Sequence, residues 1–239
     1  NRVDIANIDP TDNTLPDLSG GYLTKADKVT SDDPSAWIMA TYTGTQTDFI
    51  HETPKPSVIT SAQHTYIKSV FEKLASTAGN SSVTRGYPSV IDVPSFIDFM
   101  IINELAANVD AYQFSTYFHK DKNGKLRAGP LWDLNLTYGN DIAHWWGAES
   151  RSKIDTWQFD NWDNIGPKFW RDLFTNTTFK CYFAKRWNFL TQPGGTLNES
   201  ELNTFIDEIV AHIAEATERE EARWGTVGDH NAEIAALKD

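Results

Sequence analysis

The 239-residue sequence predicts an α+β fold, because strand-like segments come first and helix-like segments follow. Residues 1–59 hold short apolar runs separated by Gly, Pro, Asp and Ser, which is typical of strands and turns. In residues 60–239, apolar side chains recur mainly at the spacing of helices with one buried face. Strict alternation of strands and helices is missing, and this favours an α+β arrangement.

Four short segments in the first 59 residues have the composition of strands. Residues 1–5 alternate apolar and polar side chains, and residues 20–23 are typical of a turn that enters a strand. The apolar runs at 37–42 and 49–50 predict further strands, before Pro54 interrupts the pattern. We therefore expect a small sheet with many turns in this part of the chain.

The remaining residues predict mainly helices. Residues 60–78 begin with a Thr-x-x-Gln capping box and carry an apolar stripe, and residues 94–107 begin with a proline, which the first turn of a helix tolerates. Helical patterns return at 168–174 and 179–190, and a long amphipathic helix is expected to begin after Asn198.

A β-hairpin is expected after the second helix. Residues 114–119 and 126–131 have strand patterns, and the turn sequence Asp-Lys-Asn-Gly at 121–124 lies between them. The helix that precedes the hairpin is apolar on nearly all sides and is expected to be buried. Asn103 and Glu104 at its end therefore need hydrogen-bond partners.

Composition excludes several classes of protein. The chain has 33 Asp and Glu against 21 Lys and Arg, so a net charge of -12 argues against a nucleic-acid partner. No window reaches the roughly 20 apolar residues that a membrane-spanning helix needs. The single Cys181 excludes an internal disulfide and a cysteine-based zinc site. Walker A, Rossmann, GxSxG and HExxH motifs are absent from the sequence.

Two aspartates flank the predicted hairpin. Asp110 follows the buried helix, and Asp133 follows the return strand. A hairpin brings its two ends together, so the two carboxylates are expected to lie near each other and to suit Mg²⁺ together with a general base. The alternative is that each Asp only caps a turn through its own backbone.

The residues around these aspartates resemble a known family. The segments Asn103-Glu-Leu, Asn108-Val-Asp and Gly129-Pro-Leu-Trp-Asp-Leu-Asn-Leu-Thr-Tyr-Gly-Asn140 are similar to those of the spore-coat CotH kinase family. The similarity extends over nearly the whole chain. It implies a protein-kinase-like fold, reduced mainly to the helical lobe, and an atypical kinase that uses ATP and Mg²⁺ to phosphorylate Ser or Thr of a protein.

The resemblance also implies roles for single residues. Asp110 takes the catalytic-loop role and Asp133 the metal-binding role, with Glu104 organising the loop. Asn135 stands where the family has a second acidic residue, and it is a weaker metal ligand. Ser115 stands where ordinary kinases have an asparagine for a second metal. Asn108 and Trp132 belong to the same motifs and are expected to support the site.

The amino-terminal lobe that holds the nucleotide phosphates in the family is not recognisable. Lys25 and Lys28 are poor substitutes, so no ATP-contacting residue is assigned. We expect residues 1–239 to be a CotH kinase-like domain truncated at both ends, strand-rich over 1–59 and mainly helical over 60–239. The missing lobe leaves open whether this segment is active by itself. The resemblance implies an exported, cell-surface or spore-coat location. The acidity favours basic, Ser/Thr-rich protein substrates.

A tryptophan-rich loop (residues 140–167) leaves a second function open. It contains Trp145, Trp146, Trp157 and Trp162. Exposed aromatic side chains stack on sugars or peptides, which suggests a non-catalytic glycan- or protein-binding module on a degenerate kinase scaffold. The alternative is that these tryptophans fill the core, because Trp is usually largely buried.

Overall fold

The structure is a computed structural model that describes residues 3–140, 156–225 and 227–238. The chain divides into two compact units, Asn1–Phe183 and Ala184–Asp239. The first unit contains the sheet and every residue that the sequence singles out for chemistry. Helix α4 (Thr177–Thr191) crosses the boundary between the two units.

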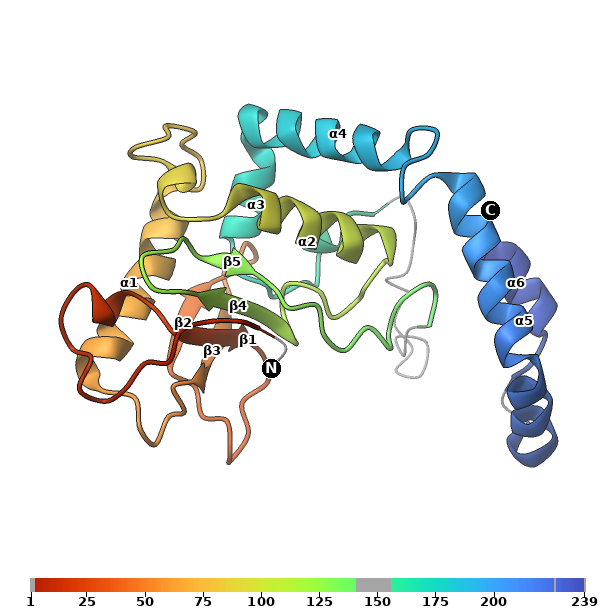
Figure 1. The fold of residues 1–239 in the computed structure, drawn as a ribbon, viewed down its shortest axis with the longest axis horizontal. Coiled ribbons are helices and arrows are strands. Elements are labelled where there is room, and N and C mark those ends of the chain that lie inside the picture. The colour runs from red at the N-terminus through yellow and green to blue at the C-terminus, as the bar shows by residue number, and fades with distance from the viewer. Residues whose placement is uncertain (1–2, 141–155, 226, 239) are drawn as a thin grey trace. The chain divides into compact units, whose positions relative to one another are not determined.

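One antiparallel sheet organises the first unit (Figure 1). Its strands are connected in the spatial order β2-β3-β1-β4-β5, so that β1 lies in the middle. Together with six α-helices in the described residues, this sheet confirms the predicted α+β fold. The strands are β1 (Tyr22–Ala26), β2 (Trp37–Ala40), β3 (Gln46–Thr53), β4 (Thr116–Lys120) and β5 (Arg127–Ala128).

Helix α1 (Ser61–Thr77) covers one face of the sheet through an aromatic core. Phe71 of α1 lies with its ring centroid 4.9 Å from that of Phe49 on β3 and 5.2 Å from that of Phe118 on β4. The predicted capping box is formed, because the hydroxyl of Thr60 accepts a hydrogen bond from the backbone N–H of Gln63 at 3.2 Å. Local sequence therefore fixes where this helix begins, and the sheet fixes which of its faces is buried.

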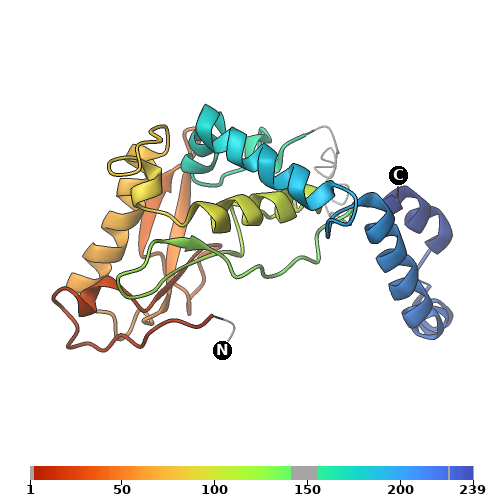
Figure 2. The same ribbon diagram turned by 45° about the horizontal axis from the view of Figure 1, so that its top comes forward.

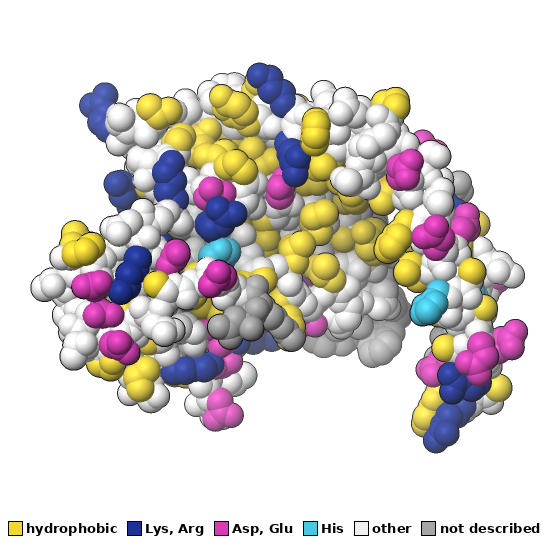
Figure 3. Space-filling model, viewed as in Figure 1, with side chains coloured by type: hydrophobic (Ala, Val, Ile, Leu, Met, Phe, Trp, Pro, Cys, Tyr) yellow, Lys and Arg dark blue, Asp and Glu magenta, His cyan; other side chains and the backbone are white. Residues whose placement is uncertain are grey.

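Helix α2 (Val93–Leu105) packs against α3 (Phe169–Thr175), as Figure 2 shows in the turned view. The buried ring of Trp170 lies 5.5 Å from Phe99 in a stacked arrangement and 5.1 Å from Phe96. Both predicted helices are confirmed within two residues of their expected bounds. Figure 3 shows hydrophobic side chains at the surface over this part of the first unit. Ile102 of α2 is only half-buried.

The predicted strand at residues 1–5 is wrong for the part that the structure describes. Val3 to Ile5 form no strand. Both neighbours of the central strand β1 are already occupied, by β3 and β4, so these residues do not extend the sheet there. Their two apolar side chains instead line a cavity together with Leu23 of β1.

The predicted hairpin is confirmed, but its return strand is shorter than the expected 126–131. Strand β5 pairs with β4 only over Arg127 and Ala128. The N–H of Gly129 still donates to the carbonyl of Tyr117 at 2.8 Å, but its φ of +114° turns the chain away from the extended conformation, and Pro130 has no N–H to donate. The chain therefore leaves the sheet early and enters an exposed loop.

The second unit contains α5 (Glu199–Trp224) and α6 (His230–Lys238). The side chain of Asn198 caps α5 by accepting a hydrogen bond from the N–H of Ser200 at 3.2 Å, as the sequence predicted. The apolar stripe of α5 stays accessible, and none of its residues is buried. Among the described residues, no helix has the length and apolar character needed to cross a membrane.

A buried histidine pair makes the stability of the fold depend on pH. His51 lies with Nε2 3.0 Å from Nδ1 of His64, and burial, followed by the charge of His64, lowers the pKa of His51 to about 4. Because the folded-state pKa lies below the ordinary value of 6.5, the unfolded chain binds the extra proton between these two pH values.

Acidification from pH 6.5 to 4 is therefore expected to remove on the order of 3 kcal/mol from the contribution of His51 to the free energy of unfolding. Urea unfolding across this pH range would measure the effect. A His51→Gln variant serves as the comparison, and its stability should fall less steeply with acidification than that of the parent. If the free energy of unfolding depends on pH equally steeply in both proteins, His51 is not the source of this pH dependence.

Candidate functional site

The first Asp loop (residues 106–115) is anchored to the end of α2 by two buried amides. Asn103 donates from Nδ2 to the carbonyl of Phe99 at 2.8 Å and accepts, on Oδ1, a hydrogen bond of 2.8 Å from Nδ2 of Asn108. The Oδ1 of Asn108 in turn accepts from the backbone N–H of Asp110 at 3.2 Å. The polar residues that end the apolar helix thus find partners in each other, and they fix the position of Asp110.

The second Asp loop (residues 129–140) lies beside the first. The N–H of Val109 donates to the carbonyl of Leu136 at 3.3 Å, and the N–H of Tyr138 donates to the carbonyl of Ala106 at 2.7 Å. A side-chain contact joins the loops as well, because Oγ of Ser115 donates to Oδ2 of Asp133 at 3.2 Å. The hairpin brings its flanks together, as the sequence predicted.

Backbone strain is concentrated in these two loops. Among the described residues, six that are not glycine have a positive φ, and five of them lie here. Residues other than glycine rarely adopt this conformation, which costs on the order of 1 kcal/mol or more each and is found preferentially at functional sites. The five residues are Ala107, Tyr112, Ser115, Asp133 and Tyr138, and Asp133 itself has φ +61°.

Glu104 connects the first Asp loop to the tryptophan-rich loop. Its carboxylate accepts from the hydroxyl of buried Tyr112 at 2.6 Å and from the backbone N–H groups of Gln158 at 2.7 Å and Phe159 at 3.3 Å. Burial raises the pKa of Glu104 to about 7, although the three hydrogen bonds favour the charged form. The carboxylate of Glu104 thus joins the end of α2, the first Asp loop and residues 158–159.

Packing beneath the first Asp loop is close enough to require a glycine. A Cβ on Gly166 would lie 2.7 Å from Oδ1 of Asn164 and 2.8 Å from Cβ of Tyr112. Asn164 donates from Nδ2 to the carbonyl of Ala111 at 3.0 Å. The loop is thus supported from below by residues about 50 positions later in the chain.

Asp133, Asn135 and Trp132 are exposed side chains of the second Asp loop. The backbone carbonyl of Asn135 accepts a hydrogen bond of 2.6 Å from Nδ2 of Asn140. The loop therefore presents a carboxylate and an amide oxygen to solvent, with the hydroxyl of Ser115 beside the carboxylate.

These oxygen donors fit a magnesium ion. Mg²⁺ prefers oxygen ligands and is usually held by one or two carboxylates, while nucleotide phosphates and water complete its shell. Among the residues with described positions, no three His, Cys, Asp or Glu side chains converge on one point. The donor set of Asp133, Asn135 and Ser115 thus suits an ion that arrives with a phosphate ligand, in contrast to a cage made of protein alone.

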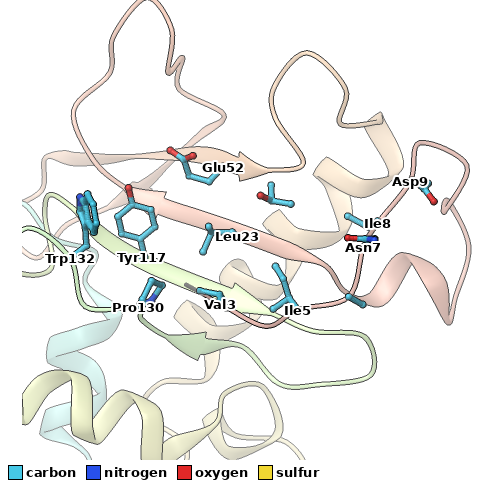
Figure 4. Close-up of a pocket in the computed structure, with 12 residues that line it drawn as sticks. Val3, Ile5, Asn7, Ile8, Asp9, Leu23, Glu52, Tyr117, Pro130 and Trp132 are labelled. Atoms are coloured by element: carbon cyan, nitrogen blue, oxygen red, sulfur yellow. The ribbon is translucent and has the colours of Figure 1, made fainter. Parts of the chain in front are cut away.

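A cavity of about 530 Å³ opens next to the second Asp loop, on the face of the sheet opposite α1 (Figure 4). Trp132, Tyr117 and Glu52 lie toward one end of it in the figure. Its apolar walls come from the amino-terminal segment (residues 3–9), the central strand and Pro130. A cavity of this volume that combines apolar walls with polar groups is large enough for a small ligand.

Lys25, to which the sequence assigns no role, is buried at this face of the sheet. Its Nζ lies 2.8 Å from Asp33, 2.9 Å from Glu52 and 3.4 Å from Asp27. Burial alone would lower the pKa of Lys25, but the hydrogen bonds to Asp33 and Glu52 outweigh it and raise the pKa. Glu52 and Tyr117, whose ring centroid is 6.0 Å from Nζ, both line the cavity.

The tryptophans of the tryptophan-rich loop have different surroundings. Trp145 and Trp146 lie outside the described residues. Trp157 packs against Phe174 with ring centroids 5.0 Å apart but is still 44% exposed, and Trp162 is 77% exposed, so neither is a buried core residue.

The described residues form an α+β protein whose two Asp loops are hydrogen-bonded to each other, and a comparison with protein families identifies it as kinase-like. The family described as CotH kinase protein matches residues 8–239, so the chain belongs to the CotH family. No curated protein and no solved structure matches the chain. Membership in a kinase-like family generally implies ATP and Mg²⁺ as cofactors and a protein as substrate.

Proposed function

We propose that the chain is an atypical protein kinase of the CotH type, which transfers the γ-phosphoryl group of ATP to Ser or Thr of a protein. The observation that carries this proposal is the pairing of the two Asp loops. Hydrogen bonds through Ser115, Val109 and Tyr138 hold the loop of Asp110 beside the loop of Asp133. Phosphoryl transfer uses one aspartate near the acceptor hydroxyl and another at the metal.

In this proposal, Asp110 orients the acceptor hydroxyl and receives its proton as the new O–P bond forms and the bond to the leaving ADP oxygen breaks. Asp133 holds Mg²⁺, with Asn135 and Ser115 as further oxygen donors. When bound, Mg²⁺ neutralises charge on the phosphates. Asn108 and Glu104 keep the first Asp loop in place through the hydrogen bonds described above.

The nucleotide is assigned to the cavity beside Trp132. Its apolar walls suit a base, and Trp132 directly precedes Asp133, so a ligand in the cavity would reach the proposed metal position. Lys25 is the cation proposed to face the phosphates. It is surrounded by three carboxylates, so phosphate binding requires exchange of at least one of them, and Asp33 on the exposed side is the one we expect to leave.

The substrate class follows from charge. With a net charge of -12, the protein attracts basic partners over the range of the Debye length, about 10 Å at 0.1 M salt. We therefore propose basic, Ser/Thr-rich proteins as acceptors. An Arg-Ser repeat peptide is expected to be labelled faster than a Glu-Ser repeat peptide of equal length.

Incubation of the chain with Mg-ATP and the Arg-Ser peptide is expected to produce phosphoserine, and removal of divalent metal with EDTA is expected to abolish the product. ATP with Mg²⁺ should also raise the melting temperature, because a ligand that binds only the folded state stabilises it. If the peptide is not labelled and the melting temperature does not shift, the kinase proposal is refuted. A shift without labelling would leave nucleotide binding standing and refute transfer by this chain.

A further inference from the structure

A second cavity, of about 380 Å³, lies at the edge of the sheet beside the carboxyl end of β2. It is formed by the turn between β2 and β3, by residues 159–168 and by the start of α3. None of its lining residues belongs to the Asp loops or lines the cavity next to Trp132. The proposed kinase reaction therefore does not use it.

The walls of this edge cavity are joined by hydrogen bonds and do not depend on a ligand for their position. Thr41 forms a β-bridge with Pro167, and the N–H of Lys168 donates to the carbonyl of Ala40 at 3.0 Å. In the turn itself, the hydroxyl of Thr41 lies 2.8 Å from that of Thr45 and 3.1 Å from that of Thr43. Tyr42 is thus held in a cross-linked turn, and a preorganised site of this kind loses little entropy when it binds a ligand.

Two aromatic rings stand at the edge cavity with large exposed surfaces. Trp162 is 77% exposed and Tyr42 is 53% exposed. The guanidinium of Arg171 lies 3.3 Å from the centroid of the Tyr42 ring, which covers one face of that ring and fixes both side chains. The ring of Trp162 remains available as a flat apolar surface.

The charged side chains of the edge cavity compensate each other in charge. Arg171 forms an ion pair with Asp160 at 2.7 Å, and Lys168 forms one with Asp172 within its own helical turn. Asn161 adds a neutral amide to the lining. The cavity therefore offers fixed donors and acceptors without a net charge that would select an anion or a cation.

We propose that this edge cavity binds a neutral saccharide. The weakly positive C–H groups on the face of a pyranose ring complement the negative face of an indole, and Trp162 supplies such a face. Vicinal hydroxyls act as both donors and acceptors, and they match the carboxylate of Asp160, the guanidinium of Arg171 and the amide of Asn161. A charged peptide or nucleic acid would find no uncompensated charge here. This site is independent of the proposed kinase activity.

Titration of the whole chain with neutral hexasaccharides of glucose, N-acetylglucosamine, xylose and mannose tests the proposal. Isothermal calorimetry is expected to show binding of at least one of them, with a dissociation constant on the order of 0.1–1 mM. Replacement of Trp162 with alanine should weaken that binding by about tenfold or more, because stacking and the buried area of the ring are both lost. Trp162 is exposed, so its removal should leave the melting temperature unchanged.

Trp224→Ala is the matched control, because Trp224 is 62% exposed and belongs to α5 in the other unit. It should bind the saccharide like the parent, and so should the Asp133→Ala variant, which separates this proposal from the kinase proposal. The saccharide proposal is wrong if none of the four sugars binds, if Trp162→Ala binds as tightly as the parent, or if only a sulfated hexasaccharide or a peptide binds.

Discussion

Replacement of Asp133 with alanine is expected to lower the rate of phosphoryl transfer by at least about a thousandfold. The proposed metal position loses its only carboxylate from the second Asp loop, because Asn135 offers a neutral oxygen that binds Mg²⁺ weakly. A loss of about 4 kcal/mol of transition-state stabilisation corresponds to this factor. Transfer of labelled phosphate from ATP to the Arg-Ser peptide, at saturating Mg²⁺, measures it.

The controls for Asp133 separate the metal from the fold. Asp133 is exposed, so the variant should melt at the same temperature as the parent. Glu218→Gln removes one negative charge from an exposed position of α5 and should keep the parent's rate. Asp110→Asn should lower kcat while Mg-ATP still raises the melting temperature, whereas Asp133→Ala should reduce that rise. Labelling that persists in Asp133→Ala would remove this residue from the metal role.

Replacement of Glu104 with alanine is expected to lower the free energy of unfolding by roughly 3–5 kcal/mol. Three donors lose their acceptor at once: the hydroxyl of fully buried Tyr112 and the backbone N–H groups of Gln158 and Phe159. Urea unfolding measures the loss. Glu72→Ala, at an exposed position of α1, removes only a surface ion pair with Lys68 and should cost less than about 1 kcal/mol.

A double-mutant cycle with Tyr112→Phe isolates the contact between the two side chains. If Glu104 acts through this hydroxyl, the cost of the double variant should be clearly smaller than the sum of the two single costs. Strict additivity would contradict the hydrogen bond of 2.6 Å as a source of stability. Kinase activity should fall with Glu104→Ala as well, because Tyr112 belongs to the first Asp loop.

Glu104 and His51 shift stability in opposite directions as pH changes. The pKa of Glu104 is raised to about 7, so the folded chain binds the extra proton, and the contribution of Glu104 is lost as pH rises from 4.5 to 7. The contribution of His51 is lost as pH falls from 6.5 to 4. The two contributions to the free energy of unfolding change with pH in opposite directions and offset each other where these ranges overlap. The His51→Gln variant should therefore show the pH dependence of Glu104, and the Glu104→Ala variant that of His51.

Local signals predicted the helices well, because caps and apolar spacing act within a few residues. The capping box at Thr60 and the cap at Asn198 both form as expected. Val3 to Ile5 show the limit of such signals. Their alternation is that of a strand, but whether they pair depends on which neighbours the central strand has already acquired, and that is a property of the whole sheet.

The candidate site was predictable where its residues are close to a recognisable motif. Asp110 and Asp133 flank a hairpin, and the two Asp loops are indeed hydrogen-bonded to each other. The surroundings of Lys25 were not predictable, because its partners are scattered from Asp27 to Glu52 and meet only through the sheet. A lysine within an apolar strand, followed by several acidic residues, is the weak signal that the sequence did contain.

The backbone bonds between the two Asp loops have a consequence for how the site opens. The amides of Val109 and Tyr138 are both donors across the same seam, one from each loop. A fluctuation that separates the loops must break both bonds together with the contact from Ser115 to Asp133. The proposed base Asp110 and the proposed metal ligand Asp133 are therefore expected to be brought together and separated as one cooperative unit.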